Sequence, residues 1–335
     1  MRSQKNKLFA AGLLVSLTLL STVAFADTWS FVVAGDGRTD PRQPVPDPTG
    51  INTPVFKNLL HIVARKKPRF MLFTGDLVCG ENASVPAKIT GQFSAWTNLV
   101  QTEAPGLPVL PVRGNHETYG DPDGNIWLAT FKPGLDANKV TYLPGEEGFS
   151  YSYSPPGHPE VVIIAVDQFM PGNIHRVNLV GLENALKQAR ANHASHIFVM
   201  AHEMAFTCTS HPDSDNMAAF PAERNKFLDL LESYGCEYFF AGHDHAYDWM
   251  AIKHPNSNWP ANYVLNQIVA GTAGAPFYAD KTYFGDHGGY DLTRLDHKQN
   301  THGYLLVVIN DDAKAASDKV KVTFETVRPK KRGWF

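Results

Sequence analysis

Six side chains of the kinds that bind metal ions follow apolar runs at widely separated places in the sequence. Each run has the composition of a buried strand, and most of the runs reach the polar residue through a glycine. In α/β sheets, ligands bind beyond the carboxyl ends of strands, so ends that are distant in sequence can converge on one site. A glycine there lets the backbone turn sharply and approach a bound group closely. We therefore predict a single site formed by Asp36, Asp76, Asn115, His202, His243 and His245.

The residue types indicate which ions this site would bind. Carboxylate and amide oxygens combined with imidazole nitrogens suit Fe, Mn or Zn better than Ca or Mg. His243 and His245 are two residues apart, so on an extended segment both side chains point to the same side. Their spacing would be roughly 6–7 Å, wide enough for each to bind a different ion of a pair about 3.5–4 Å apart. We expect two divalent or trivalent metal ions.

The elements that must position these residues alternate between apolar runs and helical patterns. Helices are expected from Thr53, around Phe93 and Trp96, and over 179–192 and 222–234. The pattern predicts strands over 29–35, 69–75, 107–114, 148–154, 160–167, 195–202 and 236–243, then over 263–271, 303–310 and 319–327. This alternation is typical of an α/β core with a β-rich C-terminal portion. No low-complexity linker divides the chain, which favours one domain over 27–335.

The blocks that contain these residues resemble the calcineurin-like metallophosphoesterase superfamily, and within it the purple acid phosphatases. The matching blocks appear in the family's order: GD at 35–36 and 75–76, GNHE at 114–117, AHE at 201–203 and GHDH at 242–245. The resemblance implies a four-layer αββα sandwich with two mixed β-sheets flanked by helices. It also implies that Asp76 bridges two metals, with Asp36 and His245 on the first and Asn115, His202 and His243 on the second. His116 matches the family histidine that contacts the phosphoryl group.

Two positions depart from the family pattern. Many members have Asp-x-His at the first block, where this sequence has Arg38, and a guanidinium cannot be a metal ligand. Purple acid phosphatases instead have a tyrosine in a GDxxY block, where this sequence has Cys79. Either the Cys79 thiolate or only water would then complete the first site, and a small buried residue or a disulfide half is the alternative. Arg38 itself is interpreted as a phosphate clamp, with an ion pair to Asp36 or Asp40 as the alternative.

The expected activity is hydrolysis of small phosphate esters, most simply monoesters, by direct attack of a metal-activated hydroxide. His116 would stabilise the transition state or protonate the leaving oxygen, and Glu117 or another nearby acid would orient it. A phosphodiesterase or nucleotide hydrolase is one alternative. Because Arg38 removes an expected ligand, a non-catalytic metal- or phosphate-binding module is another.

The N-terminus has the composition of a secretory signal peptide. Three basic residues precede an apolar run from Leu8 to Leu20, and a small-x-small cleavage site ends at Ala26. We expect export to the periplasm or medium, no membrane span in the mature chain, and a net negative charge that disfavours a nucleic-acid partner. Three cysteines permit at most one disulfide bridge, and Cys208 with Cys236 becomes the natural pair if Cys79 binds metal.

Overall fold

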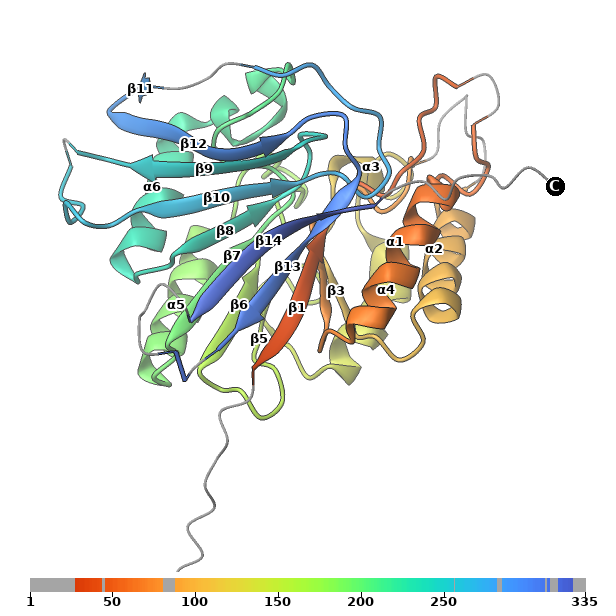
Figure 1. The fold of residues 1–335 in the computed structure, drawn as a ribbon, viewed down its shortest axis with the longest axis horizontal. Coiled ribbons are helices and arrows are strands. Elements are labelled where there is room, and N and C mark those ends of the chain that lie inside the picture. Colours follow the sequence, from red (N-terminus) through yellow and green to blue (C-terminus); the bar gives the residue numbers. More distant parts are fainter. Residues whose placement is uncertain are drawn as a thin grey trace, which may run out of the picture.

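Two mixed β-sheets form the centre of the molecule (Figure 1). The computed structural model describes residues 28–43, 46–80, 88–255, 257–281, 285–310, 312–313 and 319–327. The predicted signal peptide, residues 1–26, lies outside them. One sheet has five strands in the order β14-β13-β1-β2-β3, and the other has nine in the order β11-β12-β9-β10-β8-β7-β6-β5-β4. Both contain parallel and antiparallel pairs; β1 pairs in parallel with β2 and antiparallel with β13.

The bounds of the elements follow the apolar runs closely. The strands are β1 (Trp29–Ala34), β2 (Met71–Phe73), β3 (Val109–Pro111), β4 (Thr141–Tyr142), β5 (Tyr151–Tyr153), β6 (Val161–Ala165), β7 (His196–Met200), β8 (Tyr238–Ala241), β9 (Tyr247–Lys253), β10 (Leu265–Ala270), β11 (Gly285–His287), β12 (Tyr290–Lys298), β13 (Gly303–Ile309) and β14 (Val320–Thr326). The α-helices are α1 (Thr53–Lys66), α2 (Ile89–Glu103), α3 (Asn115–Thr118), α4 (Asn125–Ala137), α5 (Leu179–Ala191) and α6 (Pro221–Ser233). Two short 3₁₀ helices span Asp213–Asp215 and Met217–Ala219.

Three hydrophobic clusters fill the spaces between four layers. Along β1, successive side chains point to opposite faces, so Phe31 packs between the two sheets while Val32 packs toward the helices α1 and α2. On β6, Ile163 likewise faces the other sheet and Ile164 faces α5 and α6. In Figure 1, α1, α2 and α4 flank one sheet and α5 and α6 lie beside the other. The predicted αββα sandwich with helices on both outer faces is confirmed.

Some elements differ from the sequence-based expectation. Helix α4 was not predicted, and it contains Pro133. Its buried face comes from Trp127, Phe131 and Leu135, which are four residues apart and therefore lie on one side of a helix. Strands β9 and β12 were also not predicted, and they extend the larger sheet by antiparallel pairing. Among the described residues, no helix is long and apolar enough to span a membrane.

Candidate metal centre

The carboxyl ends of five strands bring the predicted residues together. Asp36 follows β1, Asp76 follows β2, Asn115 follows β3, His202 follows β7, and the two histidines 243 and 245 follow β8. The short contacts among them connect all six side chains, and Asp76 lies at the centre. Nε2 of His202 is 3.4 Å from Oδ1 of Asp76, and Nε2 of His245 is 3.4 Å from Oδ1 of Asp36.

One half of the site, which we call the Asn115 cluster, comprises Asp76, Asn115, His202 and His243. Nε2 of His202 lies 3.1 Å from Oδ1 of Asn115 and 3.1 Å from Nδ1 of His243. The other ring nitrogen of His202, Nδ1, is 2.7 Å from the carbonyl oxygen of Thr74, which can only accept a hydrogen bond. Nδ1 therefore has the proton, and Nε2 presents a lone pair to the oxygens around it.

The Asn115 cluster has the chemistry of a metal site. Burial lowers the pKa of His202 and lowers that of His243 well below its ordinary value. Both rings are therefore neutral ligands at neutral pH. The Nε2 atom of His243 is buried and has no hydrogen-bond partner. Oxygen and nitrogen atoms of Asp76, Asn115 and His202 converge beside it, where Nδ1 of His243 donates to Nε2 of His202 and the backbone N–H of His116 donates to Oδ1 of Asp76. A cation would satisfy the open lone pair on Nε2 of His243 and bind these converging atoms. These donors fit a bound metal ion.

The other half, which we call the Arg38 cluster, comprises Asp36, Arg38, Asp76 and His245. Ligand atoms of Asp36, Asp76 and His245 all lie within 4.8 Å of one another, a spacing that suits a metal ion. However, Nε of Arg38 lies 3.2 Å from Oδ2 of Asp76, and Nη2 lies 3.4 Å from Nε2 of His245. The guanidinium pairs with Asp76, and not with Asp36 or Asp40 as in the alternative to the phosphate clamp.

The protonation of the Arg38 cluster follows from the same contacts. Nδ1 of His245 is 2.5 Å from the carbonyl oxygen of Pro276 and so has the proton, which leaves Nε2 to accept from Arg38. Burial and the Asp76 carboxylate raise the pKa of Asp36. The lone pairs that a metal would need on Asp76 and His245 already accept hydrogen bonds from Arg38. The Arg38 cluster, as arranged, does not fit a metal ion.

Cys79 does not belong to either cluster. It is fully buried, its backbone N–H donates to the carbonyl of Gly50, and its sulfur is not among the ligand atoms that group with Asp36, Asp76 and His245. The structure therefore does not support Cys79 as a metal ligand. Cys79, Cys208 and Cys236 are all buried and none forms a disulfide, so the candidate bridge between Cys208 and Cys236 is not formed.

His116 lies beside Asp76, as predicted, but Glu117 does not orient it. Nδ1 of His116 is 2.7 Å from the carbonyl oxygen of Cys79, and Nε2 is 3.8 Å from Oδ2 of Asp76. Burial lowers the pKa of His116 to about 4 despite the nearby Asp76. The imidazole is thus neutral at neutral pH, with its proton on Nδ1 and its Nε2 lone pair toward the site.

The Glu117 carboxylate instead binds backbone. It accepts hydrogen bonds from the N–H groups of four residues: Asp76, Leu77, Val78 and Gly114. These bonds favour the ionised form, while burial and the neighbouring Asp76 carboxylate act against it and raise the pKa of Glu117 to about 8. Glu117 is a positioning residue for the loop after β2, and the predicted contact with His116 is wrong.

Three of the ligand positions have a strained backbone, and glycines allow close approach beside them. Asp36, Asp76 and His243 adopt left-handed conformations, with φ of 60°, 52° and 66°. A Cβ at Gly114 would lie 2.2 Å from Oδ1 of Asp76, and one at Gly242 would lie 2.4 Å from Oδ2 of Asp36. Glycine is required at both places because any side chain would displace a ligand carboxylate.

The two histidines of the GHDH block lie in different clusters, as predicted, but for a different reason. The block is a series of bends and not an extended segment, and His243 has a left-handed backbone. The ring of His243 lies near that of His202, at 4.9 Å between centroids, whereas His245 contacts Arg38. The turn, not the alternation of a strand, separates the two side chains.

Three aromatic residues at the site were not predicted from the sequence. The ring of Tyr278 stacks on that of His245 with centroids 4.3 Å apart, and the ring of His211 lies 4.1 Å from that of His243. Tyr119 accepts a hydrogen bond from Nδ2 of Asn115 at 3.1 Å. His211 and Tyr278 lie in loops, and no local sequence pattern distinguishes them.

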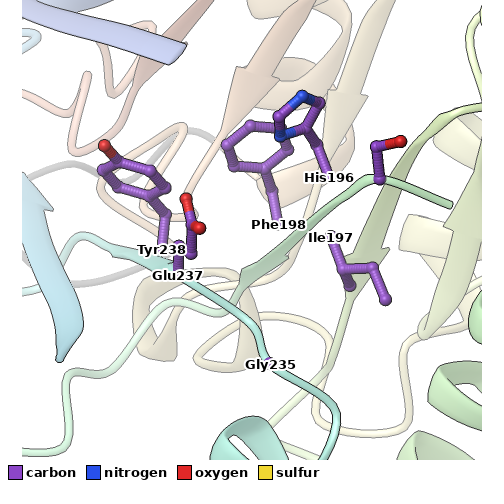
Figure 2. Close-up of a pocket in the computed structure, with 7 residues that line it drawn as sticks. His196, Ile197, Phe198, Gly235, Glu237 and Tyr238 are labelled. Carbon is purple, nitrogen blue, oxygen red and sulfur yellow. The ribbon is translucent and has the colours of Figure 1, made fainter. Parts of the chain in front are cut away.

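A separate small hollow lies at the opposite end of the larger sheet (Figure 2). Its lining comes from the amino-terminal ends of β7 and β8 and includes His196, Phe198, Glu237 and Tyr238. The metal-binding residues follow the carboxyl ends of the same strands. This hollow is therefore not part of the metal centre.

Comparison with known proteins agrees with this arrangement. The family described as calcineurin-like phosphoesterase matches residues 45–247, which is more than half of the chain. The match includes Asp76, His116, His202 and His243 but begins after Arg38. No curated protein matches the chain.

Solved structures share the fold at low sequence identity. A purple acid phosphatase, PPD1, from yellow lupin (Lupinus luteus) seeds is 14% identical with a TM-score of 0.61, covering 90% of this chain and 52% of that one. GAP50, the anchor in the inner membrane complex of Plasmodium, is 12% identical with a TM-score of 0.55, covering 92% and 87%. PhoD is 10% identical with a TM-score of 0.54, covering 84% and 64%. The chain thus spans about half the length of the lupin phosphatase chain.

Proposed function

We propose, from the premise that the chain belongs to the calcineurin-like phosphoesterase family, that it hydrolyses small phosphomonoesters with the help of bound metal. Membership of this family indicates a metal-dependent phosphoric ester hydrolase. The observation that supports this function is the Asn115 cluster, where Asp76, Asn115 and His202 converge and the buried Nε2 of His243 has no hydrogen-bond partner. Nitrogen and oxygen donors in this combination favour Fe, Mn or Zn.

Different residues of this chain would have different roles in such a reaction. Asp76, Asn115, His202 and His243 would hold the metal, which when bound supplies Lewis-acid chemistry by acidifying water and neutralising phosphoryl charge. His116 points its Nε2 toward the same space, within 3.8 Å of Asp76. The Cys79 carbonyl fixes the direction of the His116 ring by accepting from Nδ1.

The protonation of His116 bears on the monoester preference. With its pKa at about 4, His116 has no proton to give from Nε2 at neutral pH and gains one only in acid. A poor leaving alkoxide of a monoester therefore receives a proton from His116 most readily at acidic pH. This supports an acid phosphatase, a description that also applies to the lupin protein with the same fold.

The position of Arg38 favours one other function. A guanidinium paired with Asp76 removes donors from half of the site, which is compatible with a metal- or phosphate-binding module that does not hydrolyse esters. GAP50, which shares the fold, is described as the anchor in the inner membrane complex of Plasmodium. Tight phosphate binding without hydrolysis under any metal would support the module and contradict the phosphatase.

A substrate panel on the purified protein tests the proposed function. Nitrophenyl phosphate and bis-nitrophenyl phosphate are compared with Mn, Zn and Fe added separately, and faster cleavage of the monoester is expected. His202→Ala removes a ligand of the Asn115 cluster and should abolish both metal retention and turnover. His193→Gln, an exposed histidine outside the site, is the matched control and should change neither. Preferential cleavage of the diester would instead favour a phosphodiesterase or nucleotide hydrolase.

We also propose that the protein is exported to the periplasm or medium and acts there on small-molecule phosphate esters. The support is the basic and apolar sequence before Asp27. Cell fractionation followed by mass spectrometry of the intact chain should find a mature form that begins at Asp27. A cell-retained protein with an uncleaved N-terminus would contradict export.

A further inference from the structure

Arg38 places a fixed positive charge inside the Arg38 cluster. Its guanidinium contacts the shared carboxylate of Asp76 through Nε and the lone pair of His245 through Nη2. Its remaining nitrogen, Nη1, donates to the carbonyl of Thr39 at 3.3 Å. Arg38 is 5% exposed, so its side chain lies within the site and not on the surface.

The two clusters differ in whether a positively charged donor is present. In the Asn115 cluster, His202 faces the oxygens of Asn115 and Asp76, and the buried Nε2 of His243 has no hydrogen-bond partner. In the Arg38 cluster, Asp76 and Nε2 of His245 face the N–H groups of Arg38. A buried acceptor requires a hydrogen-bond donor or a cation, so the open lone pair that a cation would satisfy lies in the Asn115 cluster.

The backbone on either side of Arg38 is fixed, which keeps the guanidinium inside the Arg38 cluster. The backbone of Arg38 is held in a bridge with Ile51, and hydrogen bonds from Thr39 to Gly50 and from Asn52 to Gly37, both 2.9 Å, fix the segment on either side. A guanidinium stays protonated in proteins, so Arg38 keeps its positive charge beside Asp76. A second divalent cation in this cluster would lie beside that charge in a buried space, where repulsion is strong.

A single divalent ion keeps the net positive charge of the site small. Asp36 and Asp76 supply two negative charges when both are ionised, and Arg38 supplies one positive charge. One divalent ion in the Asn115 cluster leaves a net charge that suits an anionic phosphate ester. Two divalent ions beside Arg38 would leave a much larger positive charge with few carboxylates to offset it.

We propose that Arg38 takes the place of one cation, so that the centre binds one metal ion per chain, held by Asp76, Asn115, His202 and His243. This inference rests on the proposed function for its substrate but not for its metal content. It replaces the sequence-based expectation of two metal ions. It also gives Arg38 the role of a built-in cation beside the phosphoryl group.

Metal stoichiometry tests the inference without reference to turnover. The full-length mature protein is loaded with Mn²⁺, freed of excess by gel filtration, and measured by elemental analysis and electron paramagnetic resonance. We expect a single manganese per chain with the hyperfine pattern of an isolated ion. Two manganese ions per chain with an exchange-coupled spectrum would overturn the inference.

Substitution of Arg38 tests whether the guanidinium itself excludes a second metal ion. Arg38→His removes the guanidinium and restores a histidine two residues after Asp36, so the manganese content should double and the coupled spectrum should appear. Arg42→His, at an exposed arginine that pairs with Asp40, is the matched control and should stay at one ion.

Arg38→Met, which keeps the side chain long but uncharged, covers the case in which the histidine variant does not fold, and it should also gain manganese. If folded Arg38 variants still bind a single ion, the inference is wrong. Absence of hydrolysis by protein with one ion bound would contradict the proposed function alone.

Discussion

The carboxylate of Glu117 lies 2.6 Å from the backbone nitrogen of Gly114 and 2.9 Å from that of Asp76. One side chain therefore ties the loop after β3, which contains Asn115 and His116, to the loop after β2. The geometry of the metal centre depends on this tie although Glu117 contacts no metal-binding side-chain atom.

Glu117→Gln should destabilise the fold and weaken metal binding together. The amide can accept at only one atom, so its NH₂ group would face backbone N–H donors and leave buried groups unsatisfied, at a cost of about 2–4 kcal/mol. Urea unfolding measures the loss. Glu183→Gln, at an exposed glutamate paired with Lys187, is the control and should leave stability nearly unchanged. Equal effects of the two substitutions would show that the backbone contacts of Glu117 contribute nothing special.

His116→Gln should lower kcat and leave metal content unchanged. His116 contacts the Cys79 carbonyl and faces the site but does not belong to the Asn115 cluster. Loss of its proton-transfer role should reduce kcat by about 10²–10⁴-fold, with elemental analysis showing the wild-type metal content. Full kcat in this variant would remove His116 from the mechanism.

The pKa of His116 predicts a specific pH dependence of stability. The unfolded chain takes up a proton at this group near pH 6.5, whereas the folded chain does so only at about 4. Between these values the unfolded state binds more protons, so this group's contribution to stability is lost as pH falls. In the chelator-treated protein, the difference in unfolding free energy between wild type and His116→Gln should shift against wild type by roughly 2–3 kcal/mol from neutral pH to about pH 4. A difference that does not vary with pH would contradict the lowered pKa, which NMR titration of the His116 ring measures directly.

Gly242→Ala should disturb the site through a single added methyl group. The new Cβ would lie 2.4 Å from Oδ2 of Asp36 and 2.8 Å from Oγ1 of Thr74, so Asp36 must move. We expect a loss of about 1–3 kcal/mol in stability together with weaker metal retention. Gly91→Ala is the matched control, because nothing lies within 4 Å of its added Cβ on α2, and it should stabilise by about 0.5–1 kcal/mol. Similar behaviour of the two variants would show that close packing at Gly242 is unimportant.

Cys79→Ser should retain the wild-type metal content. Its sulfur is not grouped with the ligand atoms of Asp36, Asp76 and His245. The buried hydroxyl should lower the free energy of unfolding by about 1–3 kcal/mol. Loss of metal in a folded Cys79→Ser protein would restore the thiolate hypothesis.

The sequence predicted where the site residues converge because their order along the chain reflects the ends of buried strands. The apolar runs before Asp36, Asp76, His202 and His243 are long enough to identify strands, and glycine marks the turns after most of them. Helix α4 was not predicted since Pro133 lies within it, and its stabilising face is provided by tertiary packing of Trp127 and its neighbours.

The partners of charged side chains could not be predicted from the sequence in the same way. Arg38 and Asp76 are 38 residues apart, and only the parallel pairing of β1 with β2 brings their loops together. Glu117 follows His116 directly, which suggested a shared role, yet the short helix α3 turns the two side chains toward different groups. Adjacency in sequence does not predict the contact partners of side chains where the chain bends at each residue.

The left-handed backbone at Asp36, Asp76 and His243 lowers the stability of the fold at residues that the metal centre requires. A residue with a side chain in this conformation is strained by about 1 kcal/mol or more relative to glycine. Replacing His243 by glycine would therefore relax the main chain while it destroys the ligand set, so an inert descendant of this protein could be sturdier than its parent. Selection for durability alone would erode the centre, and only selection for activity would preserve it.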